Sequence, residues 1–186
     1  MTQIRGERLD ATGYLDGNAY ENGFFNVRFE LDDSFTFSNA DELKELNGID
    51  LDFDNEPLLT NYISRGNLVV IAHASDKKGS DPANNIFEVY MQGVTETGMY
   101  GDEKDYLEDF KAELLAAMPK AETEIDSITF LGEEHPSISV KMNVGNEVIY
   151  KRYVCLVKPQ FVSLYSVMGR DADAVDKMIN DAVMVR

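Results

Sequence analysis

The chain has 186 residues, of which 44% are apolar and 27% charged, a composition typical of one folded domain with a buried core. It carries 34 acidic against 17 basic residues, and the net charge of -17 disfavours binding to nucleic acid or anionic lipid. No apolar run is long enough to span a membrane, and a single cysteine, Cys155, excludes an internal disulfide. We expect a single domain over residues 1–186, with residues 1–13 as a loosely ordered N-terminal segment.

The first elements that the sequence predicts are a strand and two short helices. In FFNVRFEL (residues 24–31), apolar side chains alternate with polar ones, the pattern of a half-buried strand. The spacing of Asn39 and Glu42 is that of a capping box, which predicts a short helix that ends at Gly48. Pro57 suits the first turn of a second short helix, which we expect to end at about Ser64.

Two strands and the longest helix follow. NLVVIAHA (residues 67–74) and IFEVYMQGV (residues 86–94) are predicted strands, and the polar loop between them is too short for a crossover helix. We therefore expect them to pair antiparallel. Asp102 is the expected cap of a helix with an apolar stripe, which Pro119 ends.

The C-terminal part reads as a meander of four strands and a closing helix. The strands are SITFL, SISVKMNV, EVIYKRYVCLV and FVSLYSVM, and Gly145-Asn146 suits a type II′ turn between the second and third. A helical stripe runs from Asp171 to Val183. This order of elements predicts an α+β fold, with a single antiparallel sheet covered by the 102–118 and 171–183 helices.

Several stretches together resemble the Mog1p/PsbP-like fold, in its versions from lipoprotein-like proteins of Gram-positive bacteria. They are AYENGFFNVRFELDDSFTFSNADEL, the helix before LVVIAHASD, the long middle helix, VIYKRYVCLVKPQFVSLYSV and the terminal DADAVDKMI helix. The resemblance implies an αβα sandwich and, because the better-known members of the fold are non-catalytic accessory proteins, a binding role. No contact residue of those members matches a position in this chain.

The residues that could carry chemistry are few. Cys155 lies within a predicted strand, where a buried thiol is the ordinary finding, and a catalytic cysteine would need His73 or His135 held beside it. The two histidines lack metal-ligand spacing, and no phosphate-binding glycine motif occurs. We therefore assign no catalytic, cofactor-binding or metal-binding residue, and expect no cofactor.

The segment DLDFDNE places Asp50, Asp52 and Asp54 at the alternate positions at which a calcium loop begins. An EF-hand also needs Gly at its sixth position and Glu at its twelfth, where this chain has Asn55 and Asn61. We expect a solvated acidic loop with no calcium binding tighter than about the millimolar range.

Three function classes remain open. The first is a non-catalytic module that binds another protein or forms the folded part of a cell-envelope protein. The second is an enzyme that uses dispersed carboxylates such as Asp50, Asp52 and Asp54, and the third is an acidic calcium-dependent interaction domain. We favour the first, since catalytic motifs are missing. The sequence indicates no oligomeric state.

Location depends on what precedes Met1, because MTQIRGERLDATG lacks the apolar core of a signal peptide. A leader removed from this chain would place the domain in the cell envelope, as the resemblance implies, and a true start at Met1 would favour the cytoplasm.

Four aromatic residues lie outside the expected core pattern. Tyr14, Tyr20 and Phe24 fall in a glycine- and asparagine-rich segment, and Tyr100 lies in the TGMYGD turn. We expect Tyr20 and Phe24 to be mostly buried and Tyr100 to be the better candidate for an exposed contact.

Overall fold

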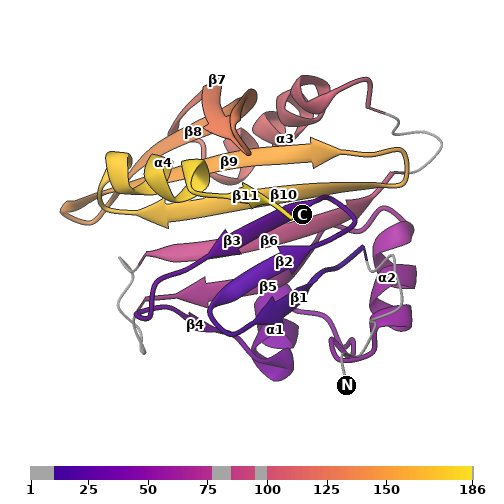
Figure 1. The fold of residues 1–186 in the computed structure, drawn as a ribbon. Coiled ribbons are helices and arrows are strands. Elements are labelled where there is room, and N and C mark those ends of the chain that lie inside the picture. Colours follow the sequence, from indigo (N-terminus) through magenta and orange to yellow (C-terminus); the bar gives the residue numbers. More distant parts are fainter. Residues whose placement is uncertain (1–10, 77–84, 95–99, 186) are drawn as a thin grey trace.

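The structure is a computed structural model that describes residues 11–76, 85–94 and 100–185. Within these ranges the chain forms two antiparallel sheets and four helices (Figure 1). The larger sheet has the strand order β4 (Thr36–Phe37), β5 (Val69–Ser75), β6 (Ile86–Gly93), β10 (Phe161–Gly169), β9 (Glu147–Val157), β8 (Glu133–Val144), β7 (Glu122–Phe130). The smaller sheet has the order β1 (Tyr14–Asp16), β2 (Ala19–Asn22), β3 (Val27–Glu30), β11 (Val183–Met184). The helices are α1 (Ala40–Asn47), α2 (Glu56–Ser64), α3 (Glu103–Ala117) and α4 (Ala172–Asn180).

The predicted combination of helices with antiparallel strands is confirmed, but the prediction of a single sheet is wrong. The 24–31 segment contributes β3, which pairs with β2 and β11 and not with any strand of the larger sheet. Val27 and Phe29 of β3 are buried and Arg28 is only half-buried, so the predicted alternation is present. Alternation shows that a strand has one buried face, but it does not identify the strand's neighbours.

The strands of the smaller sheet account for the differences between the predicted and observed elements near both ends of the described chain. β1 and β2 lie in a region for which we predicted no strand, and their three or four residues are too short to show a clear period. The closing helix ends at Asn180 and not at Val183, because Val183 and Met184 form β11. Residues 1–10 of the expected loose segment and residues 77–84 of the expected polar loop lie outside the described residues.

The helix ends follow the local sequence closely. Asn39 and Glu42 form both bonds of the capping box at the start of α1, and Gly48 ends this helix in the left-handed conformation at φ 63°. Asp102 and Asp171 accept main-chain N–H groups at the starts of α3 and α4. In the β8–β9 turn Gly145 has φ 63°, the positive angle that a type II′ turn needs at its first central position.

The two faces of the larger sheet carry separate cores. Neighbouring residues of β9 point to opposite faces: Tyr153 and Cys155 pack with α3, whereas Val154 belongs to the cluster that contains the smaller sheet and α4. The two long predicted helices therefore lie on opposite faces (Figure 1). None of the helices in the described ranges is long and apolar enough to cross a membrane.

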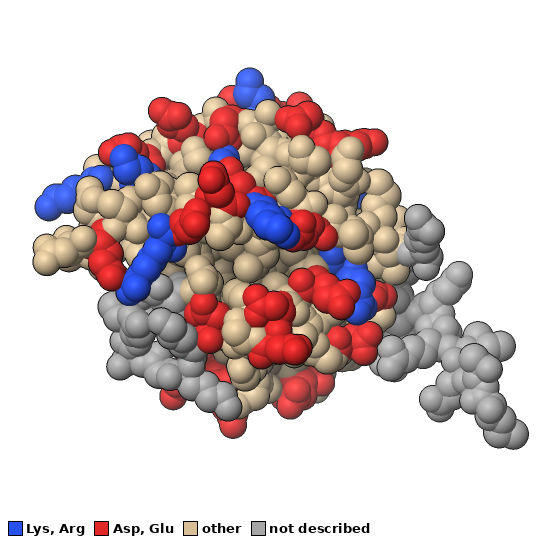
Figure 2. Space-filling view, turned by 60° about the vertical axis from the view of Figure 1, so that its left-hand side comes forward, with Lys and Arg blue, Asp and Glu red and all other residues tan. Residues whose placement is uncertain are grey.

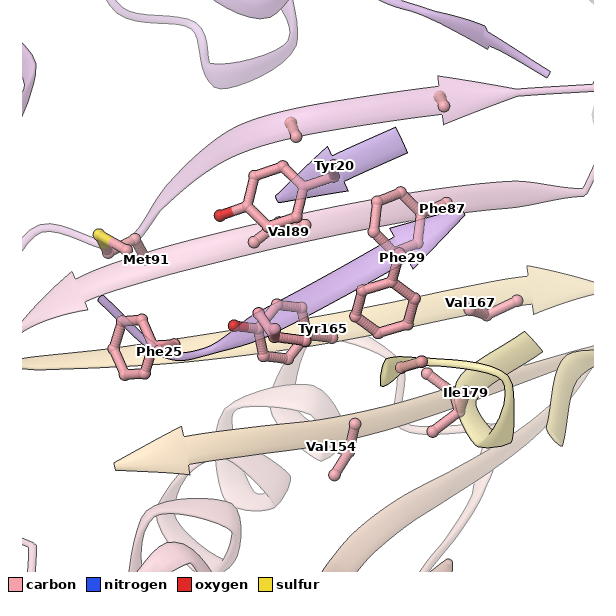
Figure 3. Packing of buried hydrophobic residues seen from close by; sticks show 14 of the residues in the cluster. Tyr20, Phe25, Phe29, Phe87, Val89, Met91, Val154, Tyr165, Val167 and Ile179 are labelled. Atoms are coloured by element: carbon pink, nitrogen blue, oxygen red, sulfur yellow. The ribbon is translucent and has the colours of Figure 1, made fainter. Parts of the chain in front are cut away.

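The core between the two sheets is rich in aromatic rings. Phe29 of β3 lies 4.8 Å from Phe87 and 5.2 Å from Tyr165 of the larger sheet, measured between ring centroids (Figure 3). Ile179 of α4 packs into the same cluster. The smaller sheet and α4 thus cover one face of the larger sheet together. Among the described strands, β1 and β11 are the edges of the smaller sheet.

Candidate functional site

A buried ion pair lies on the face of the larger sheet against which α3 packs. The ammonium of Lys151 on β9 lies 2.6 Å from a carboxylate oxygen of Glu88 on β6, and both side chains are 12% exposed. The same oxygen accepts hydrogen bonds from the hydroxyls of Tyr90 at 2.7 Å and Ser166 at 3.1 Å. Three strands therefore bring donors to one oxygen of Glu88.

The surroundings of this ion pair favour the charged forms of both Lys151 and Glu88. Burial by itself lowers the pKa of Lys151, but Tyr153, Glu88 and Tyr90 together raise it above its ordinary value. Burial opposes ionisation of Glu88, yet Lys151 and Tyr90 hold the pKa of Glu88 below its ordinary value. Burial also raises the pKa of Tyr90. At neutral pH the cluster contains no neutral amine and no phenolate, so its geometry suits a structural role better than a base or a nucleophile.

His73 lies at the side of this cluster. It stands opposite Glu88 in the pairing of β5 with β6, and its Nδ1 lies 2.9 Å from the Ser38 hydroxyl. Burial lowers the pKa of His73, an effect that the nearby Glu88 partly offsets. The imidazole is therefore neutral at pH 7, and it joins β5 to the residue that precedes the cap of α1.

Cys155 is fully buried on β9, as the sequence predicts. Burial raises the pKa of its thiol, and Sγ lies 3.6 Å from the main-chain oxygen of Glu103. Nδ1 of His135 lies 2.8 Å from the Glu103 carboxylate, and its ring packs edge-on against Phe130. The structure thus brings Cys155 and His135 to the same residue of α3, but the histidine bonds to the carboxylate of that residue and not to the thiol.

The three alternating aspartates lie in the loop between α1 and α2. Asp50 forms an ion pair with Lys44, and this lysine lowers the pKa of the Asp50 carboxyl. The Asp52 carboxylate accepts the main-chain N–H of Asp54 at 3.0 Å. These contacts shape the loop, and among the residues described no group of three or more His, Cys, Asp or Glu side chains is placed to hold a metal. The affinity of the loop for calcium stays a prediction.

An open groove of about 550 Å³ lies between the smaller sheet and α1. Residues 12–15 form one wall, and the first turn of α1 with the loop before α2 forms the other. The floor is apolar and comes from both sheets and both N-terminal helices: Tyr20, Leu43, Leu59, Ile71 and Ala72. Grooves of this volume with an apolar floor are typical of binding sites in proteins.

The rim of the groove combines exposed apolar and acidic side chains. Tyr14 and Leu15 of β1 are 41% and 46% exposed. The charged side chains of the lining are Asp41 and Asp54, and among the described residues of the lining no Lys or Arg occurs. Figure 2 shows acidic side chains spread widely over one face of the molecule and outnumbering the basic ones. The described lining of the groove therefore combines buried apolar side chains with polar and acidic ones.

Gly13 sets the path of the chain along the groove. It has φ +73°, and a Cβ at this position would lie 2.6 Å from the main-chain oxygen of Glu21. Only glycine fits so close an approach at a positive φ. The Tyr14 hydroxyl then donates to the Glu21 carboxylate at 2.5 Å, which fixes the orientation of that ring on β1.

The exposure of the four aromatic residues outside the expected core pattern agrees only in part with the prediction. Tyr20 is 1% exposed and donates to the main-chain oxygen of Thr12, which confirms its burial. Phe24 is half-buried and packs against Phe161. Tyr100 is also only half-buried, because its ring packs edge-on against Tyr106 of α3. Tyr14 is the exposed member of the set.

Sequence reasoning missed Leu15 and Asp41 as rim residues and the pairing of Lys151 with Glu88. Leu15 follows Tyr14 in the sequence, so two adjacent large apolar residues in a polar segment were an available signal. Asp41 looks like an ordinary first-turn acid of a helix. The pairing of Lys151 with Glu88 has no sequence signal, because it depends on the order of the strands in the sheet.

Comparisons with known proteins give little further information. No family model matches the chain, and no curated protein matches it. Among solved structures, the chain is similar to PA94 from Pseudomonas aeruginosa, a protein of unknown function for which a regulatory role has been suggested. The match has 14% identity and a TM-score of 0.35, and it covers 58% of this chain and 72% of that one.

Proposed function

We propose that this protein is a non-catalytic module that binds another protein, and that the groove between β1 and α1 is its binding site. One observation carries the proposal: Tyr14 and Leu15 expose large apolar side chains beside an apolar floor that is mostly buried. Exposed apolar side chains at the rim of a pocket are typical of the anchor regions of protein interfaces.

The position of the groove at a sheet edge supports a protein partner. Among the described strands β1 is an edge of the smaller sheet, and its residues Tyr14 and Leu15 line the groove. An edge strand can pair with an extended segment of another chain, which places alternate side chains into an adjacent pocket. The reactive groups support a non-catalytic role, since Cys155 is a buried thiol and Lys151 is held by Glu88.

The test is a selection of peptides from a random library displayed on phage, with the full chain as the target. Leu15→Ser is expected to abolish or strongly weaken binding of the selected peptides. Leu115→Ser is the matched control, because Leu115 is 40% exposed on α3 and is not part of the groove lining. Selected peptides that bind the Leu15→Ser and wild-type proteins equally would show that the groove is not the site.

We propose further that the fold is of the Mog1p/PsbP-like kind, with the chain as the folded part of a cell-envelope protein. The order of helices and of the long strands supports this assignment, whereas the smaller sheet is not part of the αβα sandwich that the resemblance implies. An experimental structure compared with members of that fold tests it. A better agreement with an unrelated sandwich fold would contradict the assignment.

A further inference from the structure

We infer that the partner of the groove is an extended peptide segment in which apolar side chains alternate with lysine or arginine. The inference rests on the proposed function, since it assigns a chemistry to the same site. It starts from three properties of the described residues: buried apolar side chains in the lining, the acids Asp41 and Asp54 with no described Lys or Arg in that lining, and β1 as an edge among the described strands.

The apolar part of the recognition comes from the floor and from β1. Leu59 and Ala72 are buried in the lining at 4% and 3% exposure and offer little further apolar surface, whereas Leu15 is 46% exposed. A leucine- or phenylalanine-sized side chain of the segment that packs against Leu15 removes apolar surface from water on both partners.

The charged part comes from Asp41 and Asp54 on the wall opposite β1. Both side chains are exposed, and they belong to different segments, the first turn of α1 and the loop before α2. A cation on the segment can therefore meet either acid on this wall. An anionic segment would meet like charges there, so the rim selects against acidic sequences as well as attracting basic ones.

The mode of binding follows from the strand at the rim. In an extended segment successive side chains point to opposite sides, so a segment lying along β1 can direct every second residue into the groove. The residues between them point out of the groove, where the long, flexible stem of a lysine or arginine can carry its charge to the carboxylates of the rim. The alternating pattern is thus a consequence of strand geometry and of the placement of the two acids.

The experiment uses three short synthetic peptides and the full chain in calorimetric titrations. The first peptide alternates Leu and Phe with Lys, the second has Gln in place of each Lys, and the third keeps each Lys but has Ser in place of the apolar residues. We expect the first to bind about tenfold more tightly than the second, since solvent-exposed ion pairs at the rim add a modest attraction. Added salt should reduce that advantage.

The decisive variant is Asp41→Asn with Asp54→Asn, which should remove most of the lysine advantage and leave the Gln peptide unaffected. The matched control is Asp109→Asn with Glu113→Gln, two exposed acids on α3 whose loss changes the net charge equally. Thermal melts of both double variants check that they fold.

The outcomes separate this inference from the proposed function. If both double variants bind the Lys peptide as wild type does, while Leu15→Ser abolishes binding, the groove is a peptide site without the charge selectivity inferred here. If the third peptide binds as well as the first, attraction to general acidity explains the result and the inference fails. If Leu15→Ser leaves all affinities unchanged, the proposed site itself is wrong.

Discussion

Lys151 and Arg152 are adjacent on β9, yet they face opposite sides of the larger sheet and hold their charges in different ways. Lys151 places a compact ammonium against one oxygen of Glu88, with its nitrogen 4.9 Å from the centroid of the Tyr153 ring. Arg152 uses its planar guanidinium as a fork: Nε and Nη2 donate to the two carboxylate oxygens of Asp176 at 2.8 and 2.9 Å.

The contacts of Lys151 and those of Arg152 connect different elements. Glu88 and Lys151 both belong to the larger sheet, so their contact joins strands that already share a ladder with β10. Arg152 also donates to Asp126 on β7 at 2.5 Å, and it therefore ties α4 to the edge of the sheet. The comparison shows that neighbouring basic residues stabilise different levels of structure: the first stabilises the sheet itself, and the second the docking of a helix.

The largest expected effect is that of Lys151→Met. The substitution leaves Glu88 buried without its cation, and breaking a buried pair in this way costs about 3–5 kcal/mol. Urea denaturation monitored by circular dichroism measures the loss in the free energy of unfolding.

The double variant Glu88→Gln with Lys151→Met sharpens this result. Gln keeps an acceptor for Tyr90 and Ser166 but carries no charge, so the double variant should be clearly more stable than Lys151→Met alone. A double variant no more stable than the single one would indicate that packing of the Lys151 side chain, and not the unpaired charge, sets the cost.

A smaller effect is expected for Arg152→Lys. Lysine keeps the charge but cannot span both oxygens of Asp176 and reach Asp126, and because these acids are 38% and 41% exposed we expect a loss of about 1–2 kcal/mol. Hydrogen exchange should accelerate in α4 and β11 more than in α3. Equal acceleration in α3 and α4 would contradict the assignment of Arg152 to helix docking.

The smallest expected effect concerns the pH dependence from His73. Because burial lowers the pKa of His73 in the folded state, the unfolded chain binds a proton more readily below about pH 6.5. Stability should therefore fall as the pH is lowered from about 7 to about 5. His73→Asn, which keeps a polar group near Ser38, should flatten this slope in thermal melts, and an unchanged slope would show that another group causes it.

The sequence predicts best what is determined locally. Three predicted features are present: the capping box at Asn39 and Glu42, the turn at Gly145 and the alternation in β3. Each of them is determined by residues that are close together in the sequence. The same local signals explain why Cys155 could be placed in a buried strand.

Features set by distant contacts could not be predicted in this way. The smaller sheet depends on pairing β3 with β11, far apart in the chain, and its strands of two to four residues lack a readable period. The groove likewise needs β1, α1 and the loop before α2 to be placed together by the two sheets. Sequence patterns specify the buried face of each element, and tertiary packing determines which elements contact one another through these faces.

The pairing of β3 with β11 has a consequence for the order in which the chain can fold. Val183 pairs with Arg28, so β3 receives one of its two neighbours only when nearly all of the described chain has been made. Contacts so distant in sequence form slowly, since a long loop must close before they add stability. Until α4 and β11 arrive, Phe29 and Val27 have an incomplete core around them. A nascent chain halted before α4 should therefore expose this apolar face, which is the kind of surface that chaperones bind.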